Sequence, residues 1–588
     1  MALALALLTC AALALRLTGL SFSLPHSWEP DGLVFVRQVE HLERATPDPE
    51  RDPFYGYYPH LISRLVTLTP QPAAAQAETL DDHLRAASSD RLRIRRVIAV
   101  LSALIVPGTW ILARMFLPRG PALFAAALAA FSMLQIWFAQ QSRPHAASAV
   151  FALFAVVGAV WLRRRATFDT YVVAFLLAIL ATCSLQSGFA VLIPLCAAHV
   201  LRERGGTRHA HLFFVLGLAA LAVCVWIYYP FLFATSQGRD AAALDIQGEN
   251  MNLSGHKVVL SAFNGGGFPI VLGALWNYEP ILTLLLGAAA IALAMRLRER
   301  RQGGTRVLPH PPAGWRERVA GQADLLVVLS YVVPYTLVIG MYEHTYQRFV
   351  IPLLPFAATF AAYGLFALGE RLGGNRERLT SLRSAAGLLA VALAGAQAFA
   401  AVRLVTIRCA EDTSQRAARW IEAHLDPRRD RLVHSASIDL PLCRTRAALL
   451  DAPQTFESLF PWVLYQRQIA ADRLPEPTWD LRPLRMSTPE ARERIVRDPL
   501  DYLRSTGAQY AVIEVFDDAV RQFAAPIHLA LVQGAQRVAR FSPMAVEPGD
   551  DRPMAYQDDY FDTRAVWWWR AITGRSMGPV IEIYRLGP

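Results

Sequence analysis

Residues 144–162 read PHAASAVFALFAVVGAVWL and contain no Asp, Glu, Lys or Arg. A helix needs about 17–25 apolar residues to cross a bilayer, so this stretch predicts a membrane span. Similar runs recur on both sides of it within the first 402 residues. They are 1–15, Val97–Ala113, Gly120–Ser142, Leu212–Thr235, Phe268–Met295, Leu325–Tyr342, Phe349–Gly369 and Ser384–Val402.

The run Thr170–Leu201 is too long for a single span. Its centre carries the polar segment Cys183–Gly188, so we expect a tight pair of helices there. The first run, 1–15, has no basic residue before it and no clear small-residue cleavage site after it, which favours a span over a cleaved signal peptide. Eleven spans are therefore predicted.

The composition of the whole chain agrees with a membrane protein. Of 588 residues, 54% are hydrophobic and 18% are charged, below the roughly 25% that is typical of soluble domains. A soluble cytosolic protein and a disordered protein are excluded on this ground. The long charge-free stretches exclude a disulfide scaffold as well, and the six cysteines form no CxxC motif.

The basic residues predict the orientation in the membrane. With the N-terminus in the cytoplasm, the short inner loops hold nineteen Lys and Arg residues and the short outer loops hold four. The net charge of +10 is spread between the apolar runs, which argues against a nucleic-acid partner. The C-terminal part is then expected outside the cytoplasmic (inner) membrane, on the periplasmic side.

Beyond the last apolar run the pattern changes to that of a small α/β domain. Asp412 and Thr413 predict the start of a helix over Ser414–Leu425, and Ala508–Phe516 and Val580–Leu586 read as strands. The predicted fold is mainly α: a polytopic membrane domain, residues 1–405, and an extracytoplasmic α/β domain, residues 406–588. The order of strands in the sheet does not follow from the sequence.

Three consecutive tryptophans, Trp567–Trp569, stand out in this second domain. They suit an interface or packing cluster, and they also suit a platform on which a sugar ring stacks. The sequence leaves both interpretations open.

The first outer loop, residues 17–96, carries the candidate chemistry. It begins with Ser27-Trp28-Glu29-Pro30-Asp31-Gly32 and continues into an amphipathic stretch, Leu33–Glu43, that predicts a helix along the bilayer surface. The aromatic segment 54–60 follows. A carboxylate beside such a helix suits a general base acting on a hydroxyl, with Asp31 as the first choice and Glu29 as the second.

The order of these motifs resembles the GT-C type glycosyltransferases that use polyprenyl-phosphate sugars. These include the protein mannosyltransferases of glycosyltransferase family 39 and the aminoarabinose transferases of lipid A. In such enzymes an acidic motif follows the first span, as Glu29-Pro30-Asp31 does here, and a Tyr-Pro segment comes later, as in Tyr57-Tyr58-Pro59. Later motifs that match are Ser142-Arg143-Pro144, Arg348–Pro355, and the start and end of the second domain.

The resemblance implies roles for several residues. A lipid phosphate leaves as a stabilised anion, so cations must bind it while a general acid is dispensable. Arg348, at the outer end of a span, is the first candidate for the phosphate. The other candidate substrate-binding residues are His256, Lys257, Arg143, Tyr58 and Gln186.

Three departures from the family pattern are visible. Gly32 stands where a Glu usually follows the Asp, and no Asp or Glu lies between Arg143 and Leu162, where a second acid is expected. Gln186 replaces a lysine that is common between spans five and six.

We therefore expect an inverting glycosyltransferase that moves a hexosyl or pentosyl group from a polyprenyl-phosphate donor to an unidentified acceptor at the outer face of the membrane. No cofactor is expected: the sequence has no Asp-x-Asp, and a divalent metal has no support in it. The alternatives are a transporter or flippase of a lipid-linked saccharide, and a non-catalytic membrane scaffold. A transporter predicts internal repeats and mid-membrane charges.

Overall fold

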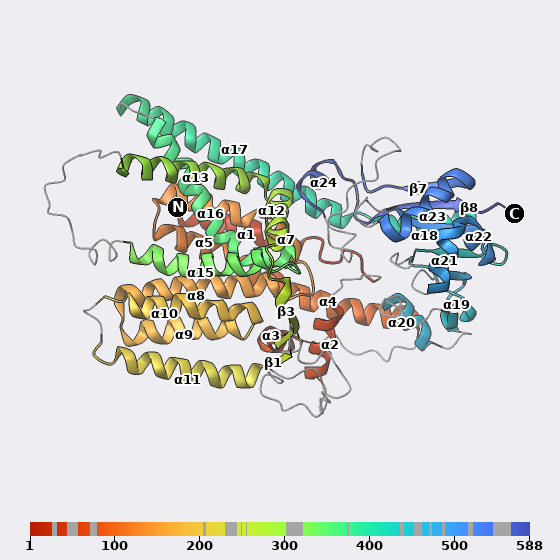
Figure 1. The fold of residues 1–588 in the computed structure, drawn as a ribbon, viewed down its shortest axis with the longest axis horizontal. Coiled ribbons are helices and arrows are strands. Elements are labelled where there is room, and N and C mark those ends of the chain that lie inside the picture. Colours follow the sequence, from red (N-terminus) through yellow and green to blue (C-terminus); the bar gives the residue numbers. More distant parts are fainter. Residues whose placement is uncertain are drawn as a thin grey trace. The chain divides into compact units, whose positions relative to one another are not determined.

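The computed structural model shows a mainly helical chain, and the predicted fold class is confirmed (Figure 1). The structure describes residues 1–25, 32–43, 57–70, 79–203, 207–229, 244–247, 250–253, 256–301, 322–372, 376–435, 440–451, 461–469, 473–484, 489–515, 521–544 and 566–587.

The helices that contain the apolar runs come first along the chain. They are α1 (Ala2–Leu17), α4 (Leu80–Ala103), α5 (Ile105–Arg114), α6 (Arg119–Ala130), α7 (Met133–Ala139), α8 (His145–Arg165), α9 (Phe168–Thr182), η1 (Gln186–Val191), α10 (Leu192–Val200), α11 (Ala210–Tyr228), α12 (Gly267–Tyr278), α13 (Pro280–Arg301), α15 (Ala323–Met341), η3 (Gln347–Leu353), α16 (Leu354–Leu372) and α17 (Arg376–Cys409). Within this group α8, α9, α10 and α11 run side by side (Figure 1).

Shorter elements lie between these helices. They are α2 (Gly32–Glu43), α3 (Leu61–Thr67), η2 (Leu260–Ala262) and an antiparallel sheet of β1 (Leu244–Gln247), β2 (Asn250–Leu253) and β3 (His256–Val259). The helix α2 is the predicted amphipathic stretch. Its described side chains are buried or half-buried, so none lies fully open to solvent or lipid.

Among the described residues, six helices are long and apolar enough to cross a membrane, or up to eight if each of two bent pairs counts as one span. Three shorter apolar segments, Ala2–Leu17, Phe168–Thr182 and Gln186–Val200, coincide with further predicted spans. Each of the eleven predicted spans thus has a helical counterpart, and the number that cross the membrane stays a prediction.

Two of the predicted spans are not straight. Gly120–Ser142 is broken between α6 and α7 with a bend of 47°, and Phe268–Met295 is broken between α12 and α13 with a bend of 115°. An apolar run predicts that a segment lies in the membrane, but it does not predict whether the helix in that segment is straight. Two residues in the sequence mark the starts of new helices at these breaks. Ser132 caps α7, and Pro280 is the first residue of α13.

The predicted helix pair in Thr170–Leu201 is confirmed, with α9 ending at Thr182 and η1 starting at Gln186. Gly188 makes the tight turn possible, because a Cβ built on it would lie 2.0 Å from the Ala181 carbonyl oxygen. Small residues allow this kind of close backbone approach between membrane helices.

The chain divides into two compact units. The first contains Met1–Thr18, Val34–Pro70 and Ile94–Val402, and the second contains Gly19–Leu33, Gln71–Arg93 and Arg403–Pro588. The second unit therefore includes parts of residues 17–96 in addition to the C-terminal residues. The division falls inside α4 and inside α17, so each of these helices contributes residues to both units.

The C-terminal part forms a five-stranded mixed sheet with helices around it. Its strands are β4 (Leu432–His434), β5 (Leu481–Pro483), β6 (Tyr510–Val515), β7 (Gln536–Phe541) and β8 (Val580–Arg585), in the order β5-β4-β6-β8-β7. The pairs of β4 with β5 and β6 are parallel, and β8 is antiparallel to both β6 and β7. Its helices are α18 (Thr413–His424), α19 (Arg446–Asp451), α20 (Pro461–Gln468), α21 (Pro489–Arg497), α22 (Pro499–Ser505), α23 (Arg521–Gly534) and α24 (Trp568–Thr573).

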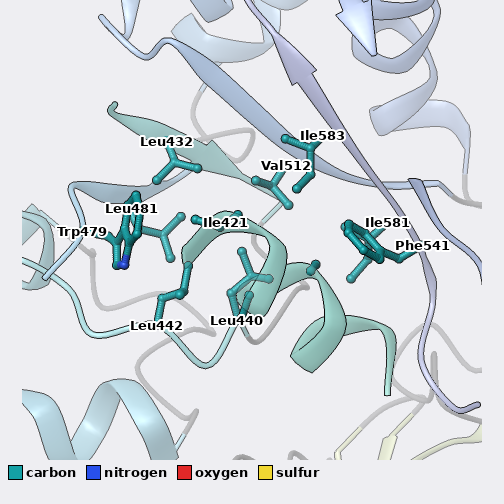
Figure 2. Close-up of a cluster of buried hydrophobic side chains, with 12 residues drawn as sticks. Ile421, Leu432, Leu440, Leu442, Trp479, Leu481, Val512, Phe541, Ile581 and Ile583 are labelled. Carbon is teal, nitrogen blue, oxygen red and sulfur yellow. The ribbon is translucent and has the colours of Figure 1, made fainter. Parts of the chain in front are cut away.

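The helix α18 packs on this sheet through an apolar cluster. Ile421 of α18 lies among Leu432, Val512 and Ile583 from three strands, with Trp479 at the side (Figure 2). The predicted start of this helix is confirmed: the Asp412 side chain accepts a hydrogen bond from the Gln415 backbone, and the Gln415 side chain accepts one from Asp412.

A buried carboxylate links the two last strands of the sheet. Glu582 of β8 accepts hydrogen bonds from His528 at 2.9 Å and from Arg537 of β7 at 3.0 Å, and Arg540 lies 3.3 Å away. A register shift between Arg537 and Ala539 brings both arginines to the same carboxylate. Burial alone would raise the pKa of Glu582, but hydrogen bonds from His528 and Tyr584 and nearby positive charge outweigh it and lower the pKa to about 2.

Replacing Glu582 by glutamine is expected to destabilise the C-terminal unit at neutral pH. Because the pKa in the folded state lies below the ordinary value of 4.5, the carboxylate stabilises the fold above that pH, and this contribution is lost as pH falls from 4.5 to about 2. At pH 7 the substitution is expected to lower the free energy of unfolding by at most about 3 kcal/mol. Thermal unfolding of the full-length protein between pH 7 and 3 measures it. The exposed Glu493→Gln serves as control, and an unchanged pH profile in Glu582→Gln would contradict the prediction.

The three consecutive tryptophans lie at the start of α24: Trp567 is its N-cap, and Trp568 and Trp569 are its first two residues. The rings of Trp568 and Trp569 meet edge to face at 4.7 Å, and Trp569 is 53% exposed. The exposed ring of Trp569 suits both of the uses predicted for the cluster.

Candidate functional site

His145, the first residue of α8, lies at the centre of an aromatic cluster. Its ring centroid is 6.1 Å from that of Tyr58, 6.3 Å from that of Phe138 and 6.4 Å from that of Phe349. Tyr58 lies between α2 and α3, Phe138 belongs to α7 and Phe349 belongs to η3. The cluster therefore joins three segments that are far apart in the sequence.

Buried amide side chains hold the Tyr57–Tyr58 segment in place. Gln38 of α2 donates hydrogen bonds to the Tyr58 carbonyl at 2.9 Å and to the Ser63 hydroxyl at 3.2 Å. Gln186, the first residue of η1, donates to the Tyr57 carbonyl at 2.8 Å. The position at which the family commonly has a lysine thus supports the aromatic segment through an uncharged hydrogen bond.

Two of the predicted phosphate-binding arginines are adjacent in sequence to members of the cluster. Arg143 stands two residues before His145 and is only 1% exposed. Arg348 directly precedes Phe349 and is half-buried. Its guanidinium lies 4.1 Å from the centre of the Tyr346 ring and 5.4 Å from that of Phe349.

Guanidinium groups in such surroundings are suited to binding an anion. Water screens a buried charge poorly, so its attraction to a phosphate is stronger than on the surface. A guanidinium can also donate two parallel hydrogen bonds to phosphate oxygens. The His145 cluster, defined as Tyr58, Phe138, His145 and Phe349 with Arg143 and Arg348 beside it, is therefore our candidate site.

The remaining predicted residues lie at the limits of the described structure. Asp31 and Glu29, the candidate bases, are outside the described residues, and α2 begins directly after them at Gly32. His256 and Lys257 belong to β3, where they pair with Leu253 and Asn252. Their side chains are also outside the described part. Among the described residues no group of three His, Cys, Asp or Glu side chains could hold a metal ion.

Three buried residues in or near the site were not predicted from the sequence. Gln38 and His41 interrupt the apolar face of α2 and are fully buried, so a polar residue at that spacing was a usable signal. His145 opens an apolar run directly after Pro144, and a lone histidine there reads as an ordinary helix end.

Searches against protein-family models and against curated proteins find no match. Among solved structures, the apo form of ArnT from Cupriavidus metallidurans is 12% identical, with 99% of this chain and 98% of that chain covered, at a TM-score of 0.44. A second structure of the same protein, bound to undecaprenyl phosphate, has a TM-score of 0.40 at 11% identity, with 91% and 96% covered. The Archaeoglobus fulgidus oligosaccharyltransferase in its apo form is 12% identical over 92% of this chain and 73% of that chain, at 0.42.

These neighbours are GT-C glycosyltransferases. A further one is the mycobacterial arabinofuranosyltransferase AftD, 16% identical over 99% of this chain and 41% of that chain, with a TM-score of 0.37. At these identities and scores, the roles of individual residues have to come from the chain itself.

Proposed function

We propose that this protein is a membrane glycosyltransferase that takes a sugar from a polyprenyl-phosphate donor and transfers it to an acceptor at the outer face of the membrane. The observation that carries the proposal is the His145 cluster, where buried Arg143 and the segment of Arg348 are brought together at the end of apolar helices. Arginines at the end of apolar helices are suited to binding the phosphate of a lipid.

In this reaction the acceptor hydroxyl attacks the anomeric carbon of the sugar, and the bond from that carbon to the phosphate oxygen breaks. The phosphate leaves as an anion, and the two guanidinium groups stabilise its charge. Asp31, or Glu29 in its place, takes the proton of the hydroxyl. Attack from the side opposite the phosphate inverts the configuration at the anomeric carbon.

The same proposal includes the setting of the protein. It is a multi-pass protein of the cytoplasmic membrane, with the N-terminus inside and the C-terminal unit on the periplasmic side, as the arginine distribution predicts. Its partners are the polyprenyl-phosphate sugar, membrane lipids and an acceptor that is a protein, a glycolipid or a polysaccharide. His256, Lys257 and Tyr58 are proposed as further contacts of the donor.

Purified wild-type protein in detergent tests the proposal. It is incubated with a panel of polyprenyl-phosphate sugars and a cell-envelope extract, and the release of free polyprenyl phosphate is followed. We expect release with at least one donor, dependent on the extract because the extract supplies the acceptor. Absence of release across the panel, with the protein folded, would favour the transporter or scaffold alternatives.

A further inference from the structure

The break between α6 and α7 is held by side chains from three other parts of the chain. Glu279, at the bend between α12 and α13, is 2% exposed. Its Oε1 accepts hydrogen bonds from the Ser132 hydroxyl at 2.6 Å and from the Leu134 backbone at 3.0 Å. Its Oε2 accepts one from Gln397 of α17 at 2.9 Å.

Two backbone carbonyl groups of the break also accept hydrogen bonds from side chains. Arg16 of α1 donates to the Ala130 carbonyl at 3.2 Å, and Gln397 donates to the Phe131 carbonyl at 3.3 Å. In an apolar medium each unsatisfied peptide group costs several kcal/mol. The break is therefore a fixed feature of the fold, and Glu279 is the group that satisfies the first turn of α7.

The helix α7 in turn connects to both segments of the candidate site. Gln135, in its first turn, donates a hydrogen bond to the Ile351 carbonyl of η3 at 3.2 Å, and η3 carries Arg348. Phe138, near its end, contacts His145, and the chain then passes through Arg143 into α8. A shift at the start of α7 must move these contacts, because the helix is only two turns long.

We propose that Glu279 is a positioning residue: by anchoring the start of α7 it places Arg143, and through η3 Arg348, for binding the donor phosphate. This inference rests on the proposed function. The hydrogen bonds of Glu279 run to Ser132, Leu134 and Gln397, so it acts through α7. A misplacement of about 1 Å in a binding group can lower a rate about 10²-fold.

The proposal is tested with Glu279→Ala, Glu279→Gln, Arg143→Gln and the double variant Glu279→Ala/Arg143→Gln. Alanine removes all three acceptor contacts, and we expect kcat/KM for the donor to fall about 10²-fold. Glutamine keeps an oxygen for Ser132 and Leu134, so we expect it to stay within about fivefold of wild type. Glu343→Ala, which removes an exposed carboxylate bonded to Asn264, is the matched control and should change nothing.

The double variant separates positioning from general destabilisation. If Glu279 acts through Arg143 and Arg348, the double variant should lose less than the product of the two single losses, because one of the two positioned groups is already gone in Arg143→Gln. Losses that multiply would overturn the proposal, as would a folded Glu279→Ala with wild-type kcat/KM. Should Glu279→Ala fail to fold, Ser132→Ala replaces it in the same comparison, with an expected loss of about tenfold.

Stabilisation by free polyprenyl phosphate provides a readout without turnover. Wild type should unfold at a higher temperature with this lipid present, and folded Glu279→Ala should show little of that shift. Equal shifts in both would refute positioning. If wild type shows neither release nor stabilisation, the proposed function itself fails, which is a different outcome from an active wild type with an equally active variant.

Discussion

Asp31→Asn is expected to lower the rate of sugar transfer by about 10²- to 10⁴-fold, the usual contribution of a general base. An acceptor hydroxyl is a weak nucleophile at neutral pH, so a carboxylate must take its proton as it attacks. Asparagine has nearly the same size and cannot take that proton. Asp31 directly precedes α2, whose Phe35 ring lies 5.9 Å from that of Tyr58 in the His145 cluster.

The measurement is the release of polyprenyl phosphate by purified Asp31→Asn, beside wild type and Glu29→Gln. Both variants must show the thermal unfolding of wild type, so that a loss of rate reports on chemistry. Transfer that survives in Asp31→Asn and disappears in Glu29→Gln would make Glu29 the base. Equal transfer in all three proteins would place the base elsewhere.

Arg143→Gln should lower kcat by about 10²- to 10³-fold, the effect expected when one donor to a developing anion is removed from a buried site. Arg143 is almost completely buried, so no water can replace its charge at the phosphate at comparable strength. Arg348→Gln should lower kcat less than Arg143→Gln does, because the Arg348 side chain is half-buried and its guanidinium already packs over the Tyr346 ring.

A conservative variant sharpens this second test. Arg143→Lys keeps the charge and loses the paired N–H donors, so it should recover part of the rate if the arginine binds phosphate. The exposed Arg429→Gln controls for loss of one positive charge. If folded Arg143→Gln transfers sugar at the wild-type rate, Arg143 is a helix-end residue with no part in binding the donor.

Much of the fold could be predicted because a membrane span depends only on the length and the mean hydropathy of a segment. The run that became α8 and the run that became α17 need only be long and apolar. The 115° bend at Glu279 could not be predicted this way, because it depends on hydrogen bonds to Ser132 and Gln397, which are more than a hundred residues away. The sheet order was out of reach for the same reason, since short strands such as β4 and β5 carry too little pattern to choose their neighbours.

The candidate site was predicted in part. Arg143, Arg348, Tyr58 and Gln186 belong to motifs, and the structure brings their segments together around one histidine. That histidine itself was not predicted, because His145 has no motif around it and becomes a site residue only through ring contacts from three distant segments. The general base stays a prediction, since Asp31 lies outside the described residues.

The place of β8 in the C-terminal sheet determines when that sheet can form. This strand lies between β6 and β7, yet it follows both of them in the chain. While the protein is being synthesised, β6 and β7 leave the ribosome without the strand that joins them. The apolar helices can enter the bilayer one after another, but this sheet has to wait for residues 580–585. Its assembly therefore comes after membrane insertion, and until β8 arrives both β6 and β7 carry unpaired backbone groups along the side that β8 will join.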